Sequence, residues 1–536
     1  MTISKYKNII KKSKTGSIIP VYKTINKAVD PVELFANLSD YGKKQNSILL
    51  ESADIVPKYG RYSFGTADPC IKLFGKNNKF SIIALNDLGK KIIDFINDDF
   101  GFCDELKIKK EKITGTLIPK KSGLSEKQRI KKTTHMDIIR KLAFRFTPVL
   151  KPFNCYGGLF GAISYDFIDQ YEKLSQDQKD PLDENDYEFY FVDNLFFIDH
   201  KKQKTHLIAN AIKLDSKTDR LLDNCEKKIN HYEKILNKDF IKPKTKNINN
   251  KIKIRSDISK KEFIKNVDKI KDHINQGDIF QCVYSQTFST KYFFPELDIY
   301  SQLKKLNPSP YMFYMNLGNT TLLGASPEMN LRVQEKNNKK IVEIRPIAGT
   351  KPRGIINNKI DPDLDSRYEI EIKTDKKEIA EHTMLVDLAR NDIAKISKSG
   401  TRVVDETFVV EKYSHVQHLV SNVCGELKED LDCLHAYTAA MNMGTLTGAP
   451  KIRAMEFLRE YEKTKRGYYG GAVCYITPDK EFDSCIIIRS MTLKNNSAYV
   501  RAGAGIVYDS IPEKEYEETQ KKARACLEAI ESAGDK

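Results

Sequence analysis

Two pairs of glutamates are the residues of this sequence whose spacing best suits chemistry. Glu378 and Glu381 lie three residues apart in one segment with helical patterning, and Glu515 and Glu518 lie three apart in another. Side chains at this spacing share one face of a helix. In both segments that face continues into apolar or small residues, so the carboxylates are expected to point partly inward. Two carboxylates at this spacing repel each other, and the repulsion grows when burial removes the water around them.

A divalent cation would relieve this repulsion. Ligand sets made only of oxygen suit hard ions, and Mg²⁺ needs one or two direct carboxylates when water and a substrate supply the other ligands. Glutamate pairs are also common where an amphipathic helix meets solvent, and there they need no ion. Spacing alone favours this second interpretation.

A series of motifs in the second half of the chain changes the balance, because together they resemble the chorismate-utilising enzymes. They follow one another from residue 277 to residue 523 in the order found in that family, which makes the resemblance specific. The matching segments are GDIFQCVYSQ (277–286), LLGASPEM (322–329), IRPIAGT (344–350), EIAEHTMLVDLARND (378–392), HVQHLVSNVCGEL (415–427), GTLTGAPKIRAM (444–455), IIIRS (486–490), RAGAGIV (501–507) and EKEYEETQKKA (513–523).

The resemblance implies a Mg²⁺ site that neutralises a dianionic substrate, chorismate. By motif match, Glu381 and Glu518 are expected to bind the ion directly, while Glu378 and Glu515 hold its water ligands. The same match implies a set of positions that hold the substrate. These are Gly349, Thr350, Tyr469, Arg489, Gly503, Gly505 and Lys522.

The resemblance also implies catalytic positions at Glu328, His418, Gln281 and Thr445. Glu328 is expected to protonate the departing 4-hydroxyl of chorismate as a general acid. His418 is expected to act in the later elimination of pyruvate. Apart from the family, Glu328 is equally well explained as an exposed glutamate after a turn proline, and His418 as a buried structural histidine.

Two positions distinguish members of the family. Members that add water to chorismate use a lysine base where this sequence has Gln281, and an amide cannot take a proton from water. Aminodeoxychorismate synthases carry a nucleophilic lysine where this sequence has Ala348. Both positions favour the anthranilate synthase large subunits, in which ammonia adds, pyruvate leaves and the ring aromatises at the start of tryptophan biosynthesis. Component I of aminodeoxychorismate synthase, in the folate branch, is the alternative.

A feedback site for L-tryptophan is a further implication. LLESAD (49–54) and NPSPYMFYM (307–315) resemble its two halves, with Glu51 expected to pair with the ammonium group and aromatic or sulfur contacts to the indole. A buried strand edge and a proline-rich turn would explain the same residues. The expected contacts are Leu50, Glu51, Ser52, Pro310, Tyr311 and Met312.

Ammonia is expected from a separate glutamine amidotransferase subunit, component II, in a heterotetramer with two copies of each subunit. None of the 10 cysteines lies in the glycine-flanked elbow of a glutaminase nucleophile, and none forms a C-x-x-C pair. No secretory signal or 18-residue apolar run is visible, so we expect a cytoplasmic protein without a membrane span. The net charge of +16 comes from lysines scattered along the chain, which does not indicate nucleic-acid binding.

The elements that must position these residues suggest an α+β fold with large layered sheets and helices. We expect an N-terminal domain at 1–240 with part of the regulatory site, a linker at 241–257, and a catalytic domain at 258–536. Ser259 and Glu262 predict a capping box and Gly277 the end of the same helix. Further helices are predicted at 216–235, 377–396, 432–442, 449–460 and 513–532, a strand at 279–289, and a loop through the lysine-rich 102–134.

Overall fold

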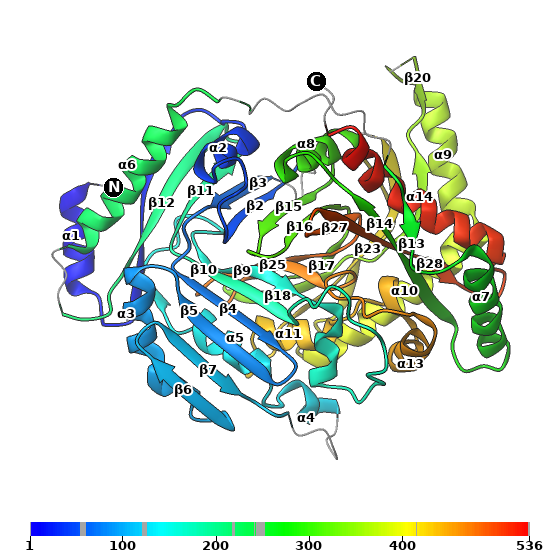
Figure 1. Cartoon of the computed structure of the whole chain (residues 1–536), viewed down its shortest axis with the longest axis horizontal. Coiled ribbons are helices and arrows are strands. Elements are labelled where there is room, and N and C mark those ends of the chain that lie inside the picture. The colour runs from blue at the N-terminus through cyan, green and yellow to red at the C-terminus, as the bar shows by residue number, and fades with distance from the viewer. Residues whose placement is uncertain are drawn as a thin grey trace.

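The computed structural model describes residues 2–53, 61–119, 126–216, 220–240, 242, 252–357, 359–413 and 415–533. These residues form two large sheets with helices around them (Figure 1). One cluster of buried side chains lies between the sheets, and two larger clusters lie between each sheet and its own helices. The layers are therefore helices, sheet, sheet, helices, which confirms the expected α+β architecture.

The first sheet joins strands from both ends of the chain. Its order is β13 (Arg255–Ser256), β14 (Gln281–Lys291), β28 (Ser497–Ile506), β27 (Ser490–Lys494), β16 (Thr321–Ser326), β15 (Tyr311–Asn316), β2 (Ser47–Glu51), β3 (Tyr62–Thr66), β11 (Asn194–Asp199), β12 (Lys204–Ile212), β1 (Ser17–Ile25) and β8 (Thr147–Pro148), with β24 (Gly448–Ala449) beside β14. Its outer face carries α1 (Ile3–Lys12), α2 (Pro31–Leu38), α6 (Leu221–Leu236), α8 (Glu296–Leu306) and α14 (Pro512–Glu531).

The second sheet has the same mixed origin. Its order is β19 (Ile347–Pro352), β23 (Val416–Glu426), β18 (Lys339–Ile344), β17 (Met329–Lys336), β26 (Phe482–Ile486), β25 (Ala472–Ile476), β9 (Gly158–Ile163), β10 (Tyr187–Val192), β4 (Ile71–Lys76), β5 (Lys79–Ala84), β7 (Lys112–Thr116) and β6 (Glu105–Lys109), with β22 (Val403–Lys412) beside β23. Its helices are α3 (Asp87–Ile96), α5 (His135–Ala143), α10 (Lys376–Ile396) and α11 (Cys433–Ala440), whereas α12 (Gly444–Thr447) and α13 (Lys451–Tyr461) pack on β14 of the first sheet.

The remaining elements are short or lie outside both sheets. Single 3₁₀ turns occur at Asn97–Phe100 and Tyr165–Gln170. A separate hairpin of β20 (Ile355–Ile356) and β21 (Lys359–Ile360) leads into α9 (Pro362–Thr374), while α7 (Lys260–Asn275) packs on β14 and α4 (Glu126–Ile130) stands near α11.

The aromatic strand sequences follow from this layering. In β10 the side chains of Phe189 and Phe191 face the helices of the second sheet, while Tyr190 and Val192 face the first sheet. Successive residues of a strand point to opposite faces. Because both faces are covered, every position of this strand is buried, and its sequence is apolar or aromatic except for Glu188, whose charge is paired with Lys72 at 2.7 Å.

Each sheet contains strands from both sides of the linker that the sequence predicts. Met312 in β15 pairs with Glu51 in β2, and Ala472 in β25 pairs with Ile163 in β9. Most of the predicted linker 241–257 lies outside the described residues. The division into domains at 1–240 and 258–536 stays a prediction, and neither sheet ends at it.

The predicted helices are confirmed, with differences at their ends. α7 begins at Lys260 after Ser259, whose hydroxyl accepts the amide of Glu262 at 3.3 Å, and Gly277 has a φ of +83° just beyond its end. The capping box is incomplete because the Glu262 carboxylate instead pairs with Lys463 at 2.8 Å. The helices at 216–235, 377–396, 432–442, 449–460 and 513–532 correspond to α6, α10, α11, α13 and α14.

The loop predicted through 102–134 is wrong. Residues 105–116 form the hairpin of β6 and β7, and 126–130 form α4; residues 120–125 lie outside the described parts. Ile113 is buried while its pairing partner Ile108 is exposed. The lysines belong to the outermost strand, where charged side chains disfavour pairing with another chain.

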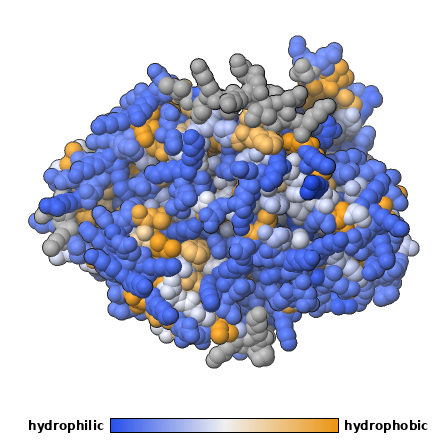
Figure 2. All heavy atoms as spheres, in the orientation of Figure 1, coloured by the Kyte–Doolittle hydropathy of each residue, from blue (hydrophilic) through white to orange (hydrophobic). Residues whose placement is uncertain are grey.

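The face of the molecule in Figure 2 is mostly hydrophilic, with small and separate apolar patches. No helix in the described parts of the chain combines the length and apolar content needed to cross a lipid bilayer.

Candidate active site

One cavity of about 580 Å³ collects the catalytic, substrate and metal positions expected from the sequence. It lies at the edge of the two sheets, between two helices. One is α10, which packs on β19 and β23, and the other is α14, which packs on β28. Figure 1 shows both helices at the same end of the molecule. The expected residues that line it are Gln281, Glu328, Gly349, Thr350, Glu378, Glu381, His418, Thr445, Tyr469, Arg489, Gly503, Gly505, Glu515, Glu518 and Lys522.

The four glutamates face one another across this cavity from α10 and α14. Burial raises the pKa of Glu378, Glu381 and Glu515, and the charge of Glu518 raises each of them further. Gln281 Nε2 donates to Glu381 Oε1 at 3.0 Å, and Lys522 Nζ pairs with Glu518 Oε1 at 2.6 Å. The carboxylates thus repel one another in a partly enclosed cavity, which is the condition a cation would relieve.

The donor set fits a divalent ion that is completed by other ligands. Searching the described residues reveals no group of three or more His, Cys, Asp or Glu side chains already arranged around a metal. A closed cage is not needed for Mg²⁺, which keeps water and substrate oxygens among its ligands. Two carboxylates from separate helices, in a cavity with room for an anion, match that requirement.

Glu328 combines burial with an unused oxygen. It lies in the turn between β16 and β17, and burial raises its pKa to about 8 against the smaller opposing effect of the Lys522 charge. Its Oε1 and the Thr445 hydroxyl oxygen make no hydrogen bond within the described chain. Glu328 is therefore protonated at neutral pH, as a general acid must be.

His418 in β23 is neutral and oriented by its neighbours. Its Nδ1 lies 2.9 Å from Thr350 Oγ1 and 3.3 Å from the carbonyl oxygen of Gly349, and burial lowers its pKa to about 4. A carbonyl only accepts hydrogen bonds, so Nδ1 carries the proton in that contact. Nε2 is then left as the proton acceptor of the ring.

Two cations stand where the resemblance expects substrate carboxylates. Arg489 is buried, which lowers its pKa, and its Nη1 donates to the carbonyl of Lys522 at 3.0 Å. Lys522 Nζ in turn donates to the carbonyl of Gly503 at 3.0 Å. The positive φ of Arg489, +50°, places this residue in a conformation that side chains seldom adopt.

The glycines of β28 are required by close approach rather than by a turn. A Cβ at Gly503 would lie 3.1 Å from the Tyr469 hydroxyl, and one at Gly505 would lie 2.8 Å from Gln281 Nε2. Both positions sit inside the strand and not at its end. Larger residues would move Tyr469 and Gln281 out of the cavity.

A second cavity, of about 260 Å³, brings together the six expected tryptophan contacts. It lies between the sheets, against β2, β15, β25 and β26, and Ser52 Oγ donates to the carbonyl of Pro310 at 2.6 Å. The contacts Leu50, Glu51, Ser52, Pro310, Tyr311 and Met312 all line it.

Glu51 differs from its expected role in this cavity. Tyr300 donates to its Oε1 at 2.5 Å and Lys304 to its Oε2 at 2.7 Å, so both carboxylate oxygens bond to α8. Strand alternation turns Glu51 toward the helices, whereas its neighbour Leu50 faces the space between the sheets. The carboxylate is therefore already paired and is not presented to an ammonium group.

Sequence reasoning missed several lining residues. Arg501 lines the first cavity, and Arg61 and Asp483 line the second. Tyr311 donates to Asp483 at 3.1 Å, and burial raises the pKa of Asp483 to about 6. The sequence feature that could have revealed Arg501 and Asp483 is a charged residue inside a segment that otherwise has the pattern of a buried strand.

Comparison with known proteins gives a consistent result. A family model described as chorismate binding enzyme matches residues 102–528. Anthranilate synthase component 1 of Vibrio cholerae is 40% identical, covering 96% of this chain and 97% of its own length, and that of Buchnera aphidicola from Acyrthosiphon pisum is 39% identical over 96% and 97%.

Solved structures agree. Anthranilate synthase component I of Streptococcus pneumoniae matches with 31% identity and a TM-score of 0.67, covering 88% of this chain and 93% of that one. The menaquinone-specific isochorismate synthase of Escherichia coli matches with 15% identity and a TM-score of 0.62 over 99% and 100%, which is a likeness of fold alone.

Proposed function

Because this chain belongs to the chorismate-binding enzyme family and resembles anthranilate synthase component 1 proteins over nearly its whole length, we propose that it makes anthranilate. In this reaction ammonia adds to chorismate, and pyruvate and water leave. The observation that carries the proposal is one cavity in which a protonated Glu328 faces Gln281 and Ala348, so that acid catalysis is available and a lysine is absent from both discriminating positions.

Substrate binding falls to the cationic side of the cavity. Arg489 and Lys522 would pair with the carboxylates of chorismate, and the narrow space beside Gly503 would admit an anionic oxygen close to the backbone. Burial strengthens these interactions because little water competes for the charges.

The first chemical step uses Glu328 and Gln281. Glu328 gives its proton to the 4-hydroxyl as that group leaves as water. Gln281 cannot deprotonate a water molecule, whereas ammonia is nucleophilic without a base. Gln281 Oε1 is buried and makes no hydrogen bond in the described structure, so it can accept one from the incoming ammonia.

The second step restores aromaticity. A proton leaves the ring carbon that bears nitrogen, and the enolpyruvyl oxygen leaves from the neighbouring carbon. His418 Nε2 is the acceptor that the ring's hydrogen bonding leaves available, and Thr350 and the Gly349 carbonyl hold the ring in place.

Mg²⁺ is part of the proposal. Glu381 and Glu518 would bind it and Glu378 and Glu515 would hold its waters, while the ion would supply positive charge for a substrate carboxylate. Support comes from the mutual repulsion of these carboxylates in a buried cavity.

The other amine-forming reaction, that of aminodeoxychorismate synthase, receives less support. Its expected lysine is replaced by Ala348, which is buried in the wall of the cavity and offers only a methyl group. Relatives whose sequences are about 40% identical to this chain are named anthranilate synthase component 1.

We also propose a glutaminase partner and a cytoplasmic location. Relatives named component 1 imply a component II, and a heterotetramer with two copies of each subunit is the arrangement we expect. All ten cysteines are free, and most are buried, which suits a reducing compartment.

Feedback inhibition by L-tryptophan is proposed at the second cavity. Its lining combines the Tyr311 ring and the Leu50 side chain, which face the space between the sheets and suit an indole, with the Asp483 carboxylate. The Met312 side chain lies on the same face as its pairing partner Glu51 and packs toward the helices, so the thioether contact expected from the sequence is not part of this proposal. Both acidic side chains of this lining already have partners, Glu51 in α8 and Asp483 in Tyr311 and the nearby Arg332 charge, so an ammonium group would compete with these partners for either carboxylate.

The direct test is an incubation of the purified chain with chorismate, Mg²⁺ and ammonium, with and without tryptophan. We expect fluorescent anthranilate and an equal amount of pyruvate, and less of both when tryptophan is present. A para-substituted amino product on chromatography would favour the folate-branch alternative, and no product would refute the proposal.

A further inference from the structure

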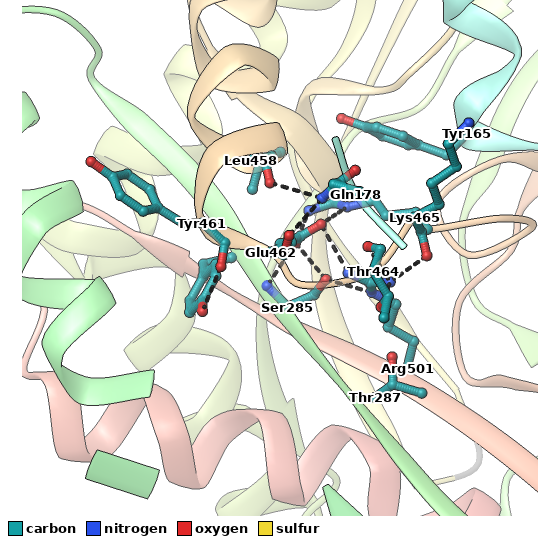
Figure 3. A network of polar contacts seen from close by, with 12 residues as sticks. Tyr165, Gln178, Ser285, Thr287, Leu458, Tyr461, Glu462, Thr464, Lys465 and Arg501 are labelled. Carbon is teal, nitrogen blue, oxygen red and sulfur yellow. Dashed lines mark hydrogen bonds and ion pairs between the residues drawn. The ribbon is translucent and has the colours of Figure 1, made fainter. Parts of the chain in front are cut away.

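A buried ion network lies directly behind the wall of the candidate active site (Figure 3). Glu462 follows α13, and its carboxylate accepts from Arg466 Nε at 2.9 Å and Arg466 Nη2 at 2.7 Å. Arg501 Nη2 also donates to it at 2.9 Å, and Ser285 Oγ at 2.6 Å. Figure 3 shows Glu462 facing Ser285 and Arg501. All three side chains are buried.

Arg466 joins three parts of the cavity wall. Its Nη1 donates to the carbonyl of Leu446 at 2.5 Å and its Nη2 to the carbonyl of Val283 at 2.6 Å. Its guanidinium also lies between two rings, 5.7 Å from the centroid of Tyr469 and 4.5 Å from that of Tyr165. Leu446, Val283 and Tyr469 line the cavity, whereas Arg466 itself does not.

The charges explain why the network holds its shape. Glu462 carries one negative charge against the two positive charges of Arg466 and Arg501, and these arginines keep the pKa of the buried carboxyl below its usual range. Removing one partner of a buried ion pair leaves an uncompensated charge. The remaining positive charge lies beside a cavity that must admit an anion.

We propose that Arg466, held by Glu462, is a positioning residue that sets the distances between Val283, Leu446 and Tyr469 around the substrate. Its guanidinium bonds the carbonyls of Val283 and Leu446 and lies over the Tyr469 ring, and a flat fork with several N–H groups is needed to make these contacts and the pair with Glu462 at once. The identity of that substrate, chorismate, rests on the proposed function, but the positioning role does not depend on which product forms.

Arg466→Lys tests this role because it keeps the charge and removes the fork. Arg459→Lys is the matched control: Arg459 lies in α13, is equally buried, and pairs with Asp166 at 2.8 Å and Asp169 at 3.0 Å, but neither of these partners lines the cavity. For both variants we would measure the melting temperature, kcat and KM with chorismate, and the dissociation constant of chorismate by calorimetry.

We expect both variants to melt at lower temperatures than the wild type. Only Arg466→Lys should bind chorismate more weakly, with kcat/KM lower by about tenfold to 10²-fold, because small misplacements of active-site groups have effects of that size. Equal losses of stability with an unchanged KM and dissociation constant in both variants would overturn the proposal.

A second pair of variants covers the case in which Arg466→Lys does not fold. Glu462→Gln removes the charge that holds Arg466, and Asp169→Asn is its control beside Arg459. A weaker chorismate complex in Glu462→Gln alone supports the proposal, and unchanged binding refutes it. If the wild type binds chorismate without forming anthranilate, the proposed function fails while these binding constants still decide the role of Arg466.

Discussion

The protonation of Glu328 gives a prediction that can be followed across a pH range. Burial raises its pKa to about 8, above the ordinary value for a glutamate. A group with this pKa is about nine-tenths protonated at pH 7 and about one-tenth protonated at pH 9, so a reaction that needs the acid form slows about tenfold over that range. The neighbouring His418, with a pKa of about 4, does not titrate there.

The assay must separate this effect from the supply of ammonia, which becomes more abundant as pH rises. We would adjust total ammonium at each pH so that the concentration of free ammonia stays constant, and record initial rates of anthranilate fluorescence at saturating Mg²⁺ and at chorismate well below its KM, where the rate reports the groups of the substrate-free enzyme. The rate should fall above about pH 8. Glu328→Gln should be slower by about 10²- to 10⁴-fold and should lose this pH dependence, because its amide has no proton to give.

Glu184→Gln is the control for this experiment. Glu184 is also buried with its pKa raised to about 7, but it accepts from the amide of Tyr468 and from Thr492 and does not line the candidate active site. Its variant should keep the fall in rate above pH 8. A wild-type rate that stays constant from pH 7 to pH 9, or the same fall in Glu328→Gln, would refute Glu328 as the acid.

Three further predictions concern the metal, the inhibitor and the backbone. Glu381→Ala and Glu518→Ala should each lower turnover more than about 100-fold at saturating Mg²⁺, while the control Glu528→Ala, on the exposed side of α14, should not. Full activity in both Glu381→Ala and Glu518→Ala would exclude the metal assignment. Leu50→Ala should raise the tryptophan concentration for half-inhibition at least about tenfold, since Leu50 faces the cavity between the sheets and a buried leucine contributes about 1.5 kcal/mol or more; unchanged sensitivity would exclude this cavity. Gly448→Ala should lower the free energy of unfolding by about 1–3 kcal/mol. The reason is that φ at this position is +127° and an added Cβ would lie 2.1 Å from the Gln281 carbonyl oxygen. A denaturant unfolding curve identical to that of the wild type would contradict this prediction.

The sequence predicted the active-site composition well because its signals are local. Glu378 and Glu381 share a helix face by spacing alone, and the resemblance adds the residues that meet them from other segments. The structure then places these residues in one cavity. Helix periodicity and motif order are both properties that a single sequence displays directly.

The role of Glu51 could not be predicted in the same way. Its partners Tyr300 and Lys304 lie on α8, a helix that the sequence analysis did not identify, and the face of β2 on which Glu51 lies depends on register with β15. Strand register is set by tertiary pairing, and a shift of one residue reverses every side chain.

The network around Arg466 was equally hidden from sequence reasoning. Glu462 and Arg466 are close in sequence, but Ser285, Val283 and Arg501 reach them from distant strands. In the sequence Glu462 and Arg466 look like ordinary surface charges. Only the packing of β14, β28 and the segment after α13 buries them together.

The central claim is that this cavity adds nitrogen, rather than water, to chorismate and completes the reaction to an aromatic product. The most direct measurement is mass spectrometry of the products formed by the purified chain from chorismate, Mg²⁺ and nitrogen-15-labelled ammonium. Our account predicts labelled anthranilate in equal amount to pyruvate. Unlabelled isochorismate, or a labelled para-amino product without pyruvate, would contradict it.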